Sequence, residues 1–470
     1  MNQDIEEHLR VTLEQQRAAF SSEPFPTLAI RRDRLARVRA MTAQHAQALA
    51  EAVSQDFENR AHQETMLTEV FTVQSAARHA MRHLPGWMKT RRVPTAMHFW
   101  PARNRLLRQP LGVVGVVSPW NYPYYLAMAP AVAALAAGNR VLIKPSELTP
   151  ATSELMARMV RENFAPEEMQ VVVGDADVGR AFTSLPFDHL FFTGSTAVGR
   201  IVAQAAAKNL TPVTLELGGK SPAFIDRSAD LSLTAERLAF GKLLNAGQTC
   251  VAPDYVLAPR EMVAPLVEAL LARMRAMYPS LAGNADYTSI VSPRHHARLQ
   301  ALLDDARAKG ARLVPTHTET AGGRKLVPHL VLDATEQMTV MQEEIFGPLL
   351  PIMAYDNANE AVDFIRRHDR PLALYWFGRD DQAQRQVMER THAGGVTVND
   401  CIWHLGQEEQ PFGGVGASGI GAYHGEWGFR TFSKEKPIFE QSRFAGTKLF
   451  YPPYGATFNH LLGALKKIAG

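Results

Sequence analysis

Residues 189–220 read HLFFTGSTAVGRIVAQAAAKNLTPVTLELGGK. This segment opens with a β-rich apolar run, His189–Thr193, and closes with another, Val213–Leu217. Between the two runs, Gly194 leads into a helical pattern over Ala197–Lys208. A strand, a glycine turn, a helix and a second strand are typical of a parallel crossover unit, whose ligand crevice lies where the strands end. The segment therefore predicts an α/β fold with a parallel sheet.

The same alternation continues on both sides of this segment. Continuous apolar runs between helical patterns indicate a parallel sheet that helices cover on both faces. On the N-terminal side the strand candidates are Val113–Val117, Arg140–Lys144 and Met169–Val173, and the helical patterns are Pro123–Ala137, Ala151–Asn163 and Asp177–Ser184. A second α/β stretch covers 218–395, with strand candidates Ser221–Ile225, Tyr255–Leu257, Leu349–Tyr355 and Ala373–Phe377. We expect the functional motifs to lie at the carboxyl ends of these strands.

Composition and charge exclude several classes of protein. The chain has 470 residues, of which 46% are hydrophobic and 21% charged, and this rules out a largely disordered chain. Its net charge of +3 argues against a nucleic-acid partner. The N-terminal MNQDIEEHLR lacks the apolar region of a secretory signal, and the longest apolar stretch, Tyr122–Gly138, is too short and interrupted to span a bilayer. Because Cys250 and Cys401 alone make no disulfide framework, we expect a cytoplasmic protein.

Two residues are candidates for covalent and acid–base chemistry. Cys250 follows the polar run NAGQT, which we expect to be flexible, and both a buried packing cysteine and a nucleophile fit this local sequence. Glu216 ends an apolar run, where burial would raise its pKa and suit it to act as a general base. A salt bridge between Glu216 and Lys220 fits the local sequence equally well.

Three turns contain candidate ligand-binding residues. Gly194 precedes a helix start, which attracts phosphate, although its spacing to Gly199 matches neither the ordinary dinucleotide motif nor the P-loop. Lys144 and Glu147, in KPSE, suit the hydroxyl groups of a ribose, and Asn121, in PWNYP, suits a developing oxyanion. Each of these residues also fits an ordinary solvated turn.

Two clusters of basic side chains have simpler interpretations. A solvated helix face is predicted for five arginines, Arg31, Arg32, Arg34, Arg37 and Arg39. His79 and His83 have the i,i+4 spacing that presents two imidazoles to a metal, but the sequence offers no evident third ligand. We therefore predict no metal site.

Taken together, the motifs closely resemble those of the aldehyde dehydrogenase superfamily. The matches follow the family order from about Gln109 to Ser442: PWNYP, KPSE, FTGSTAVG, ELGGKSP, GQTC, EEIFGP, GGVTVND and PFGGVG. Within the superfamily the chain resembles the class 3 branch, through CVAPDY after the cysteine and the later YHG. It is most similar to the coniferyl aldehyde dehydrogenases, through QPLGVVGVVSPWNYP, PLALYWFG and YPPYG.

The resemblance implies a covalent mechanism. Cys250 would attack the aldehyde carbon, and Asn121 with the Cys250 backbone N–H would stabilise the oxyanion of the resulting thiohemiacetal. Hydride transfer would leave a thioester, which Glu216 would hydrolyse by activating water, with Glu344 as an alternative base. Coenzyme A-acylating relatives lack this glutamate, so Glu216 indicates a free carboxylic acid as the product.

The resemblance also implies a dinucleotide cofactor, NAD, with NADP still possible. Lys144 and Glu147 would hold the adenosine ribose, and Glu147 would repel the 2′-phosphate of NADP. Gly194 would carry the pyrophosphate. The nicotinamide ribose would contact Glu344 and Phe346. The other residues assigned to the cofactor site are Pro119, Trp120, Ser195, Gly199 and Leu217.

The implied architecture is the aldehyde dehydrogenase fold. A Rossmann-like cofactor domain would cover 1–90 and 114–217, and an α/β catalytic domain 218–395. A small β element, 91–113 and 396–445, would bridge the subunits of a homodimer, followed by a C-terminal tail, 446–470. Beyond the family motifs, Trp403 and His404 are candidates for an aromatic substrate pocket or for packing, and Cys401 fits a small packing residue better than a substrate contact.

The predicted function is NAD(P)-dependent oxidation of an aromatic or medium-chain aldehyde to its acid. A fatty-aldehyde dehydrogenase of the same branch is the first alternative. A cofactor-independent cysteine esterase is a second, but it has no use for the predicted dinucleotide site. A third is a structural protein that kept only the fold, which the intact Cys250, Glu216 and Asn121 argue against.

Overall fold

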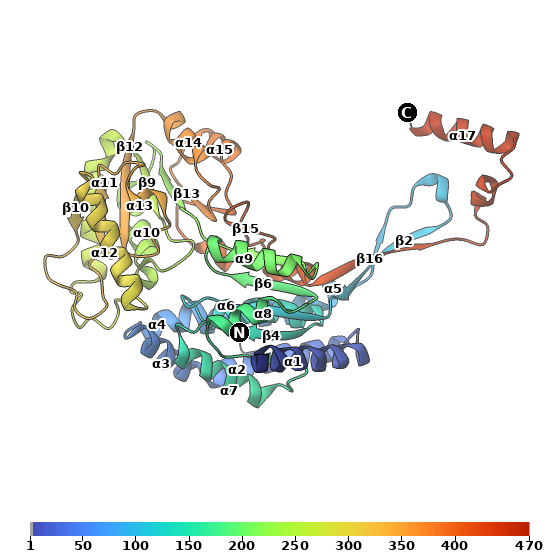
Figure 1. Cartoon of the computed structure of the whole chain (residues 1–470). Helices are drawn as coiled ribbons and strands as arrows, with labels where there is room; N and C mark the ends of the chain where they lie inside the picture. Colours follow the sequence, from blue (N-terminus) through green and yellow to red (C-terminus); the bar gives the residue numbers. More distant parts are fainter. Residues whose placement is uncertain (1–2, 470) are drawn as a thin grey trace.

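The computed structural model describes residues 3–469, which form a two-lobed body with a projecting arm (Figure 1). Each lobe is built around one sheet, and a third, smaller sheet forms the arm. The α/β class predicted from the sequence is confirmed. Most predicted strands match the observed ones to within two residues, because continuous apolar runs are a strong signal for buried parallel strands.

The first lobe contains a six-stranded sheet. Its strands, in spatial order, are β15 (Gly419–Ile420), β7 (Val213–Glu216), β6 (His189–Thr193), β3 (Val113–Val117), β4 (Arg140–Lys144) and β5 (Met169–Val171). All neighbours pair in parallel except β15, which runs antiparallel to β7. The carboxyl ends of β3, β4, β6 and β7 therefore share one edge, as the sequence predicts.

Helices cover both faces of this sheet, because alternate strand residues point to opposite sides. Leu190 and Phe192 pack with α1 (Gln3–Ser22), α8 (Ala176–Thr183) and α9 (Thr196–Ala207). Phe191 belongs to the core on the other face. The helical elements on that side are α2 (Leu28–Gln44), α3 (Ala46–Phe57), α4 (His62–Thr65), the π-helical turn η1 (Met66–Phe71), α5 (Thr72–Trp87), α6 (Tyr125–Ala137), α7 (Pro150–Asn163) and α16 (Gly425–Thr431).

The second lobe contains a seven-stranded sheet. Its strands, in spatial order, are β10 (Arg312–Pro315), β11 (His329–Leu332), β12 (Leu349–Tyr355), β9 (Tyr255–Pro259), β8 (Pro222–Ile225), β13 (Ala373–Phe377) and β14 (Gly395–Val398). Helices α10 (Leu231–Leu243) and α11 (Arg260–Met277) pack on one face. The other face carries α12 (Pro293–Ala308), α13 (Thr339–Gln342), α14 (Ala358–Arg367) and α15 (Asp381–Arg390).

The way the two sheets meet corrects one expectation. Cys250 precedes β9, and Glu344 and Phe346 precede β12, so these residues lie at the amino ends of their strands. Glu216 ends β7 and Asn121 follows β3. The expectation that all motifs lie at carboxyl ends is therefore wrong, because one sheet contributes its carboxyl edge to the site and the other its amino edge.

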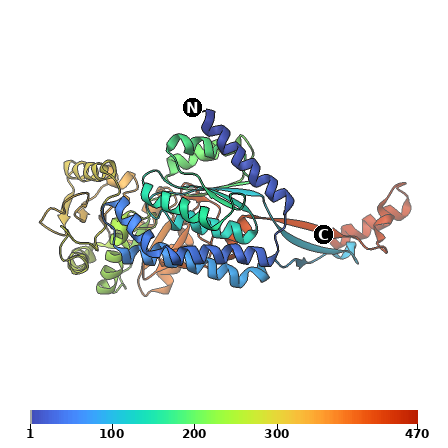
Figure 2. The ribbon, with the colours of Figure 1, turned by 90° about the horizontal axis from the view of Figure 1, so that it is seen from below.

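The arm consists of the three strands β1 (Arg91–Val93), β2 (Arg103–Pro110) and β16 (Ser433–Glu440), with a short turn, η2 (Met97–Phe99), between the first two. It leads to η5 (Gly446–Phe450) and α17 (Ala456–Ala469), far from the body in both views (Figures 1 and 2). β14 and β15 fall within the predicted bridging range 396–445 or at its border, yet they pair with the sheets of the two lobes. The arm sheet is thus confined to 91–110 and 433–440.

The predicted solvated face is confirmed for Arg32 and Arg39, which are exposed, and is wrong for two of the other arginines. Arg31 and Arg34 are fully buried. Arg31 donates to the carbonyls of Ala136 (3.2 Å) and Ala137 (2.6 Å), which lie in the last turn of α6. Arg34 pairs with Glu168 at 2.9 Å. The prediction failed because the Arg31 guanidinium caps the end of α6, a helix far away in the sequence. Local patterns do not reveal such a contact.

The apolar stretch Tyr122–Gly138 contains the whole of α6, which is buried on all sides in the first lobe. Among residues 3–469, the structure contains no helix with the length and apolar character that crossing a membrane requires.

Candidate active site

Cys250 lies at the end of a tightly constrained turn. The 3₁₀ turn η3 (Leu244–Gly247) follows α10, and its residues Asn245 and Ala246 have left-handed φ angles of 52° and 50°. Gly247 has a φ of 75°, and a Cβ there would lie 2.3 Å from the Gly347 carbonyl oxygen, so only glycine fits. A backbone this strained is kept only where its surroundings fix it. The turn therefore holds Cys250 in one place.

Hydrogen bonds supply that constraint, and they overturn the prediction of a flexible run before Cys250. The Asn245 amide donates to the carbonyls of Asn121 (2.9 Å) and Gln248 (3.1 Å). The Gln248 side chain accepts from Val291 N at 2.9 Å and donates to the Ser289 carbonyl at 3.1 Å. The polar side chains of this run are buried, because they hold the backbone instead of meeting solvent.

Two cavities meet at Cys250. One is apolar and is lined by Tyr125, Phe240, Trp403 and Phe412 among others. The other is polar and is lined by the start of α9 together with residues of the predicted cofactor site. Cys250 and Glu216 line both cavities. A molecule in each cavity would therefore reach the same thiol.

Glu216 points into this junction with no partner. Among residues 3–469, neither of its buried carboxylate oxygens has a hydrogen-bond partner, and burial raises its pKa well above the ordinary value. The alternative of a salt bridge to Lys220 is wrong: Lys220 Nζ lies 2.5 Å from Asp254 Oδ2. A buried carboxyl without a partner is costly to the fold, which makes Glu216 a candidate for acid–base chemistry.

Cys250 rests as a thiol in this setting. Burial, followed by the nearby carboxyls of Glu344 and Glu216, raises its pKa to about 12. Burial also raises the pKa of Glu344 to about 8. The three groups therefore favour their protonated forms together, and a proton must leave before the sulfur can act as a nucleophile.

Asn121 follows β3 and lies beside the cysteine turn. Its Nδ2 donates to the Gln248 carbonyl at 3.1 Å, and it lines the polar cavity with Cys250. An amide at this position has an N–H directed toward the cysteine turn, where an oxyanion would develop. The structure thus brings together all three residues that were predicted to be catalytic.

A buried ion pair that the sequence did not reveal positions Asn121. Arg60 Nη1 donates to the Asn121 carbonyl and to Glu69 Oε1, each at 3.0 Å. Glu69 Oε2 accepts from the backbone N–H groups of Tyr124 (2.7 Å) and Tyr125 (3.2 Å), where α6 begins. Arg60 and Glu69 lie 61 and 52 residues before Asn121, so no local motif connects them.

Replacing Arg60 by methionine is expected to lower the free energy of unfolding by about 3–5 kcal/mol, because Glu69 would remain as a buried, uncompensated charge. The shift of the urea midpoint measures this effect. The exposed Arg39→Met is the control, with an expected change below about 0.5 kcal/mol. Equal midpoints for the two variants would show that the pair contributes nothing.

The polar cavity contains seven of the ten residues predicted to bind a cofactor. They are Pro119, Trp120, Gly194, Ser195, Leu217, Glu344 and Phe346. Ser195 caps α9, with its Oγ accepting from Val198 N. The Trp120 ring stacks edge-on against Phe346, with centroids 5.3 Å apart. Gly218, His295 and Arg298 also line the cavity and were not predicted; a Cβ at Gly218 would lie 2.0 Å from Glu344 Oε2, so the Glu344 carboxylate packs directly against this glycine.

The other three residues predicted to bind a cofactor, Gly199, Lys144 and Glu147, do not line the polar cavity. Gly199 faces Leu217, where an added Cβ would lie 2.6 Å from Leu217 Cδ2, so it allows close packing of α9 on β7. Lys144 ends β4 and donates to the Pro145 carbonyl at 2.6 Å. Glu147 is exposed and lies three residues beyond Lys144. Both stay at the same sheet edge as Pro119, because β4 pairs with β3, and their role stays a prediction.

The sequence left a role in a substrate pocket or in packing open for Cys401, Trp403 and His404, and the lining of the apolar cavity separates them. Trp403 lines it and stacks on Phe240, with centroids 5.9 Å apart and planes 10° apart. His404 is not in its lining and bonds to Thr397 Oγ1 at 2.8 Å. Cys401 is fully buried against Gly241, which fits the predicted packing role. Glu408 and Glu216 are the charged residues of the lining, and burial raises the pKa of Glu408 to about 7.

Comparison with known proteins agrees with this geometry. The model of the "Aldehyde dehydrogenase family" matches residues 3–438. A "Probable coniferyl aldehyde dehydrogenase" of Pseudomonas aeruginosa is 48% identical over 454 residues, covering 97% of this chain and 95% of the relative. A "Coniferyl aldehyde dehydrogenase" of Pseudomonas sp. strain HR199 is 45% identical, covering 98% and 96%.

A solved structure is similar over nearly its whole length. The substrate-bound state of Staphylococcus aureus AldH superposes with a TM-score of 0.91 at 36% identity, covering 97% of this chain and 98% of that one. Cys250 lies at the junction of an apolar and a polar cavity, and these proteins match nearly the whole length of the chain. The two observations agree. The chain belongs to the aldehyde dehydrogenase family and is an oxidoreductase.

Proposed function

We propose that this enzyme oxidises aromatic aldehydes of the coniferyl aldehyde type to carboxylic acids, with NAD as the preferred cofactor. The observation that carries the proposal is the shared position of Cys250 and Glu216, at the contact between the apolar and the polar cavity. The aldehyde would enter from the apolar side and the cofactor from the polar side. Relatives that are 48% and 45% identical carry coniferyl aldehyde dehydrogenase names, which supports the aromatic substrate.

The walls of the apolar cavity fit a flat aromatic substrate. Tyr125, Phe240, Trp403 and Phe412 surround it, and aromatic rings prefer stacked or edge-to-face neighbours. Glu408 adds one carboxyl group that accepts a hydrogen bond from the Gly425 backbone at 3.2 Å. Its other oxygen is suited to accept from the phenolic hydroxyl of a substrate. A saturated chain would gain nothing from this group.

Replacing Glu408 by leucine is therefore expected to lower kcat/KM about tenfold for coniferyl aldehyde, since a hydrogen bond to a charged group contributes about 1.5–3 kcal/mol. The kcat/KM for cinnamaldehyde, which has the same skeleton without the ring substituents, should change less than threefold. Steady-state kinetics with both aldehydes measure the ratio. An equal loss for both would mean that Glu408 only supports the fold.

The polar cavity fits a dinucleotide. It offers the start of the twelve-residue helix α9, where phosphate binds favourably, and the buried Thr193 Oγ1, which has no hydrogen-bond partner among residues 3–469. Trp120 and Phe346 form an aromatic wall, and Glu344 lies against Gly218. Gly194 and Ser195 would hold the pyrophosphate, and Glu344 would hold the nicotinamide ribose. When bound, NAD supplies a hydride acceptor.

The residues of the chain act in two successive half-reactions, which are the formation of a thioester on Cys250 and its hydrolysis. Cys250 Sγ bonds to the aldehyde carbon as its proton passes to water, and the π electrons of the carbonyl move to the oxygen. Asn121 Nδ2 and the Cys250 N–H donate to that oxyanion, which is worth about 3–4 kcal/mol for each donor. Collapse of the oxyanion expels hydride from the carbon and leaves a thioester on Cys250. Glu216 then takes a proton from water, whose oxygen displaces the sulfur and yields the acid.

The preference for NAD rests on Glu147. Its carboxylate is exposed beyond β4, at the sheet edge that carries the cofactor cavity. A 2′-phosphate near this carboxylate would add a like-charge contact, whereas a free ribose hydroxyl would donate a hydrogen bond to it. The ratio of kcat/KM for NAD and NADP measures the preference.

The arm supports a homodimer. Its exposed apolar side chains include Met97 (68%), Trp100 (69%) and Phe439 (50%), and a projecting three-stranded sheet needs a partner surface to cover them. The partner would be a second copy of the chain that packs against the arm. The free thiols of Cys250 and Cys401 fit a reducing compartment, and we place the enzyme in the cytoplasm.

The proposal is tested with a panel of aldehydes and the absorbance of reduced nicotinamide. The purified enzyme receives NAD or NADP with coniferyl aldehyde, benzaldehyde, hexanal or a long-chain aldehyde. Highest kcat/KM for coniferyl aldehyde with NAD supports the proposal, and highest kcat/KM for the long-chain aldehyde moves the assignment to the fatty-aldehyde alternative. No reduction with any pair would refute the aldehyde oxidation itself.

A further inference from the structure

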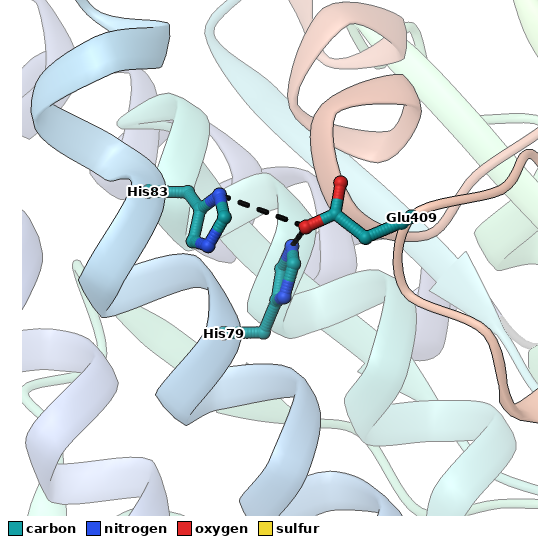
Figure 3. Close-up of side chains that lie close together, drawn as sticks. All are labelled: His79, His83 and Glu409. Atoms are coloured by element: carbon teal, nitrogen blue, oxygen red, sulfur yellow. Dashed lines mark ion pairs between the residues drawn. The ribbon is translucent and has the colours of Figure 1, made fainter.

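Outside the active site, two histidines and a glutamate converge on one point (Figure 3). His79 and His83 lie one turn apart on α5, and Glu409 belongs to the loop that follows η4 (Trp403–Gly406). Glu409 Oε1 lies 3.6 Å from His79 Nε2 and 3.8 Å from His83 Nδ1. The third ligand that the sequence did not reveal is therefore present, 326 residues beyond His83.

The spacing of these atoms fits a metal ion better than direct bonding between the side chains. One nitrogen from each histidine and one glutamate oxygen lie within 4.8 Å of one another. A tetrahedral ion with bonds of 2.0–2.1 Å needs ligand atoms about 3.3 Å apart, so small side-chain shifts would complete the geometry. Both carboxylate–imidazole distances exceed the usual length of a hydrogen bond.

The surroundings place the two imidazoles side by side and leave one of them without a partner. The rings of His79 and His83 stack with centroids 4.2 Å and planes 18° apart, so one ring must rotate before both nitrogens face the same ion, and Trp87 packs against both. His79 Nε2 is buried and has no hydrogen-bond partner within residues 3–469. A buried polar atom of this kind calls for an explanation, and a bound ion is among the usual ones. Glu409 is 74% exposed, which leaves a side open for water as a fourth ligand.

We propose that His79, His83 and Glu409 form a binding site for a divalent transition-metal ion, with Zn²⁺ as the first candidate. Two imidazoles and one carboxylate are a donor set that suits Zn²⁺ and other first-row metals, and not Mg²⁺ or Ca²⁺, which prefer oxygen alone. The i,i+4 histidines of one helix provide two ligands without any change in the backbone.

The site joins two elements that both line the apolar cavity. Thr72 and Ser75 on α5, and Gln407 and Glu408 in the loop, contribute to that lining. A bound ion would fasten the loop to the helix directly beside Glu408. Metal binding therefore stabilises the aldehyde-binding form of the cavity rim, a consequence that rests on the proposed function.

The binding site is tested without turnover, in metal-free Cys250→Ala protein, because the thiol is itself a ligand for soft metals. Titration with Co²⁺ should saturate at one equivalent and give the intense visible bands of a tetrahedral site, and Zn²⁺ should displace them. Glu409→Gln and His83→Ala are expected to weaken binding at least about tenfold, whereas His8→Ala, on the exposed side of α1, should leave it unchanged. Glu409 is exposed, so its substitution should not disturb folding.

Absence of saturable Co²⁺ binding, or equal binding by the Glu409→Gln variant, would overturn the site. In the same Cys250→Ala protein, Zn²⁺ should lower the dissociation constant of coniferyl aldehyde at least about threefold, and not in the Cys250→Ala, Glu409→Gln double variant. Binding of the ion with no change in aldehyde affinity would overturn the link to the cavity rim. Since neither measurement needs oxidation, failure of the proposed function and failure of the metal site remain distinguishable.

Discussion

Replacing Cys250 by alanine is expected to lower the rate of aldehyde oxidation at least about 10⁴-fold, which corresponds to about 5 kcal/mol of transition-state stabilisation. Among residues 3–469, Cys250 carries the only thiol that lines either cavity, and a thiol is a stronger nucleophile than the hydroxyl and carboxyl groups beside it. The neighbouring Glu216 and Glu344 are carboxyls, and their pKa values are raised by burial. Loss of a nucleophile typically removes nearly all catalysis, while binding is kept.

The measurement is the formation of reduced nicotinamide from NAD and coniferyl aldehyde. Two controls accompany it. Cys401→Ala should retain activity within about threefold, because Cys401 is buried against Gly241 and does not line either cavity. The Cys250→Ala protein should still bind NAD, because the rest of the polar cavity is unchanged.

The same variants separate the competing functions. If the wild-type protein hydrolyses an activated ester but reduces no NAD, and Cys250→Ala abolishes the hydrolysis, the esterase alternative is correct. Residual oxidation by Cys250→Ala within tenfold of the wild type would refute the covalent route. A wild-type thiol that reacts with neither aldehyde nor iodoacetamide would favour a protein that kept only the fold.

Replacing Glu216 by glutamine is expected to lower the steady-state rate by about 10²–10⁴-fold, which is the usual contribution of a general base. The first turnover should survive, because Cys250 and Asn121 are unchanged. Rapid mixing should therefore show a burst of about one reduced nicotinamide per active site, followed by slow turnover. Intact-protein mass spectrometry should find the acyl group on Cys250, as a thioester that accumulates because its hydrolysis is slow.

The second carboxyl of the site provides the matched comparison. Glu344 has a pKa of about 8, and it lies against Gly218 in the cofactor cavity. If Glu344 is the base, Glu344→Gln and not Glu216→Gln will accumulate the thioester. If Glu216→Gln shows no burst, Glu216 acts before the thioester forms, as the acceptor of the Cys250 proton.

The rates of the wild-type enzyme in the burst and in the steady state depend on pH through the protonation of three groups at the site. Cys250, Glu216 and Glu344 all have pKa values raised by burial, and each must lose its proton to act. The rate should therefore rise with pH through the neutral range, and Glu216→Gln should remove the part of this rise that belongs to the hydrolysis of the thioester.

The sequence by itself determined the local structure and predicted which groups react. Apolar runs such as His189–Thr193 and Ala373–Phe377 predicted strands with the observed bounds, because burial on both faces of a parallel sheet leaves a continuous apolar pattern. The family motifs identified Cys250, Glu216 and Asn121, which the structure brings to one place. The resemblance was sufficient to predict these residues because each lies in a short contiguous motif that can be recognised without the structure.

Only the tertiary structure decided the partners of these groups. Lys220 bonds to Asp254 and leaves Glu216 free, Arg60 holds the Asn121 carbonyl, and Arg34 is buried against Glu168. The convergence of His79, His83 and Glu409 is of the same kind. Each contact joins residues that are tens to hundreds of positions apart, and the packing of helices and sheets sets it. Burial and electrostatics act through space, so a pattern along the chain carries no record of which charge meets which.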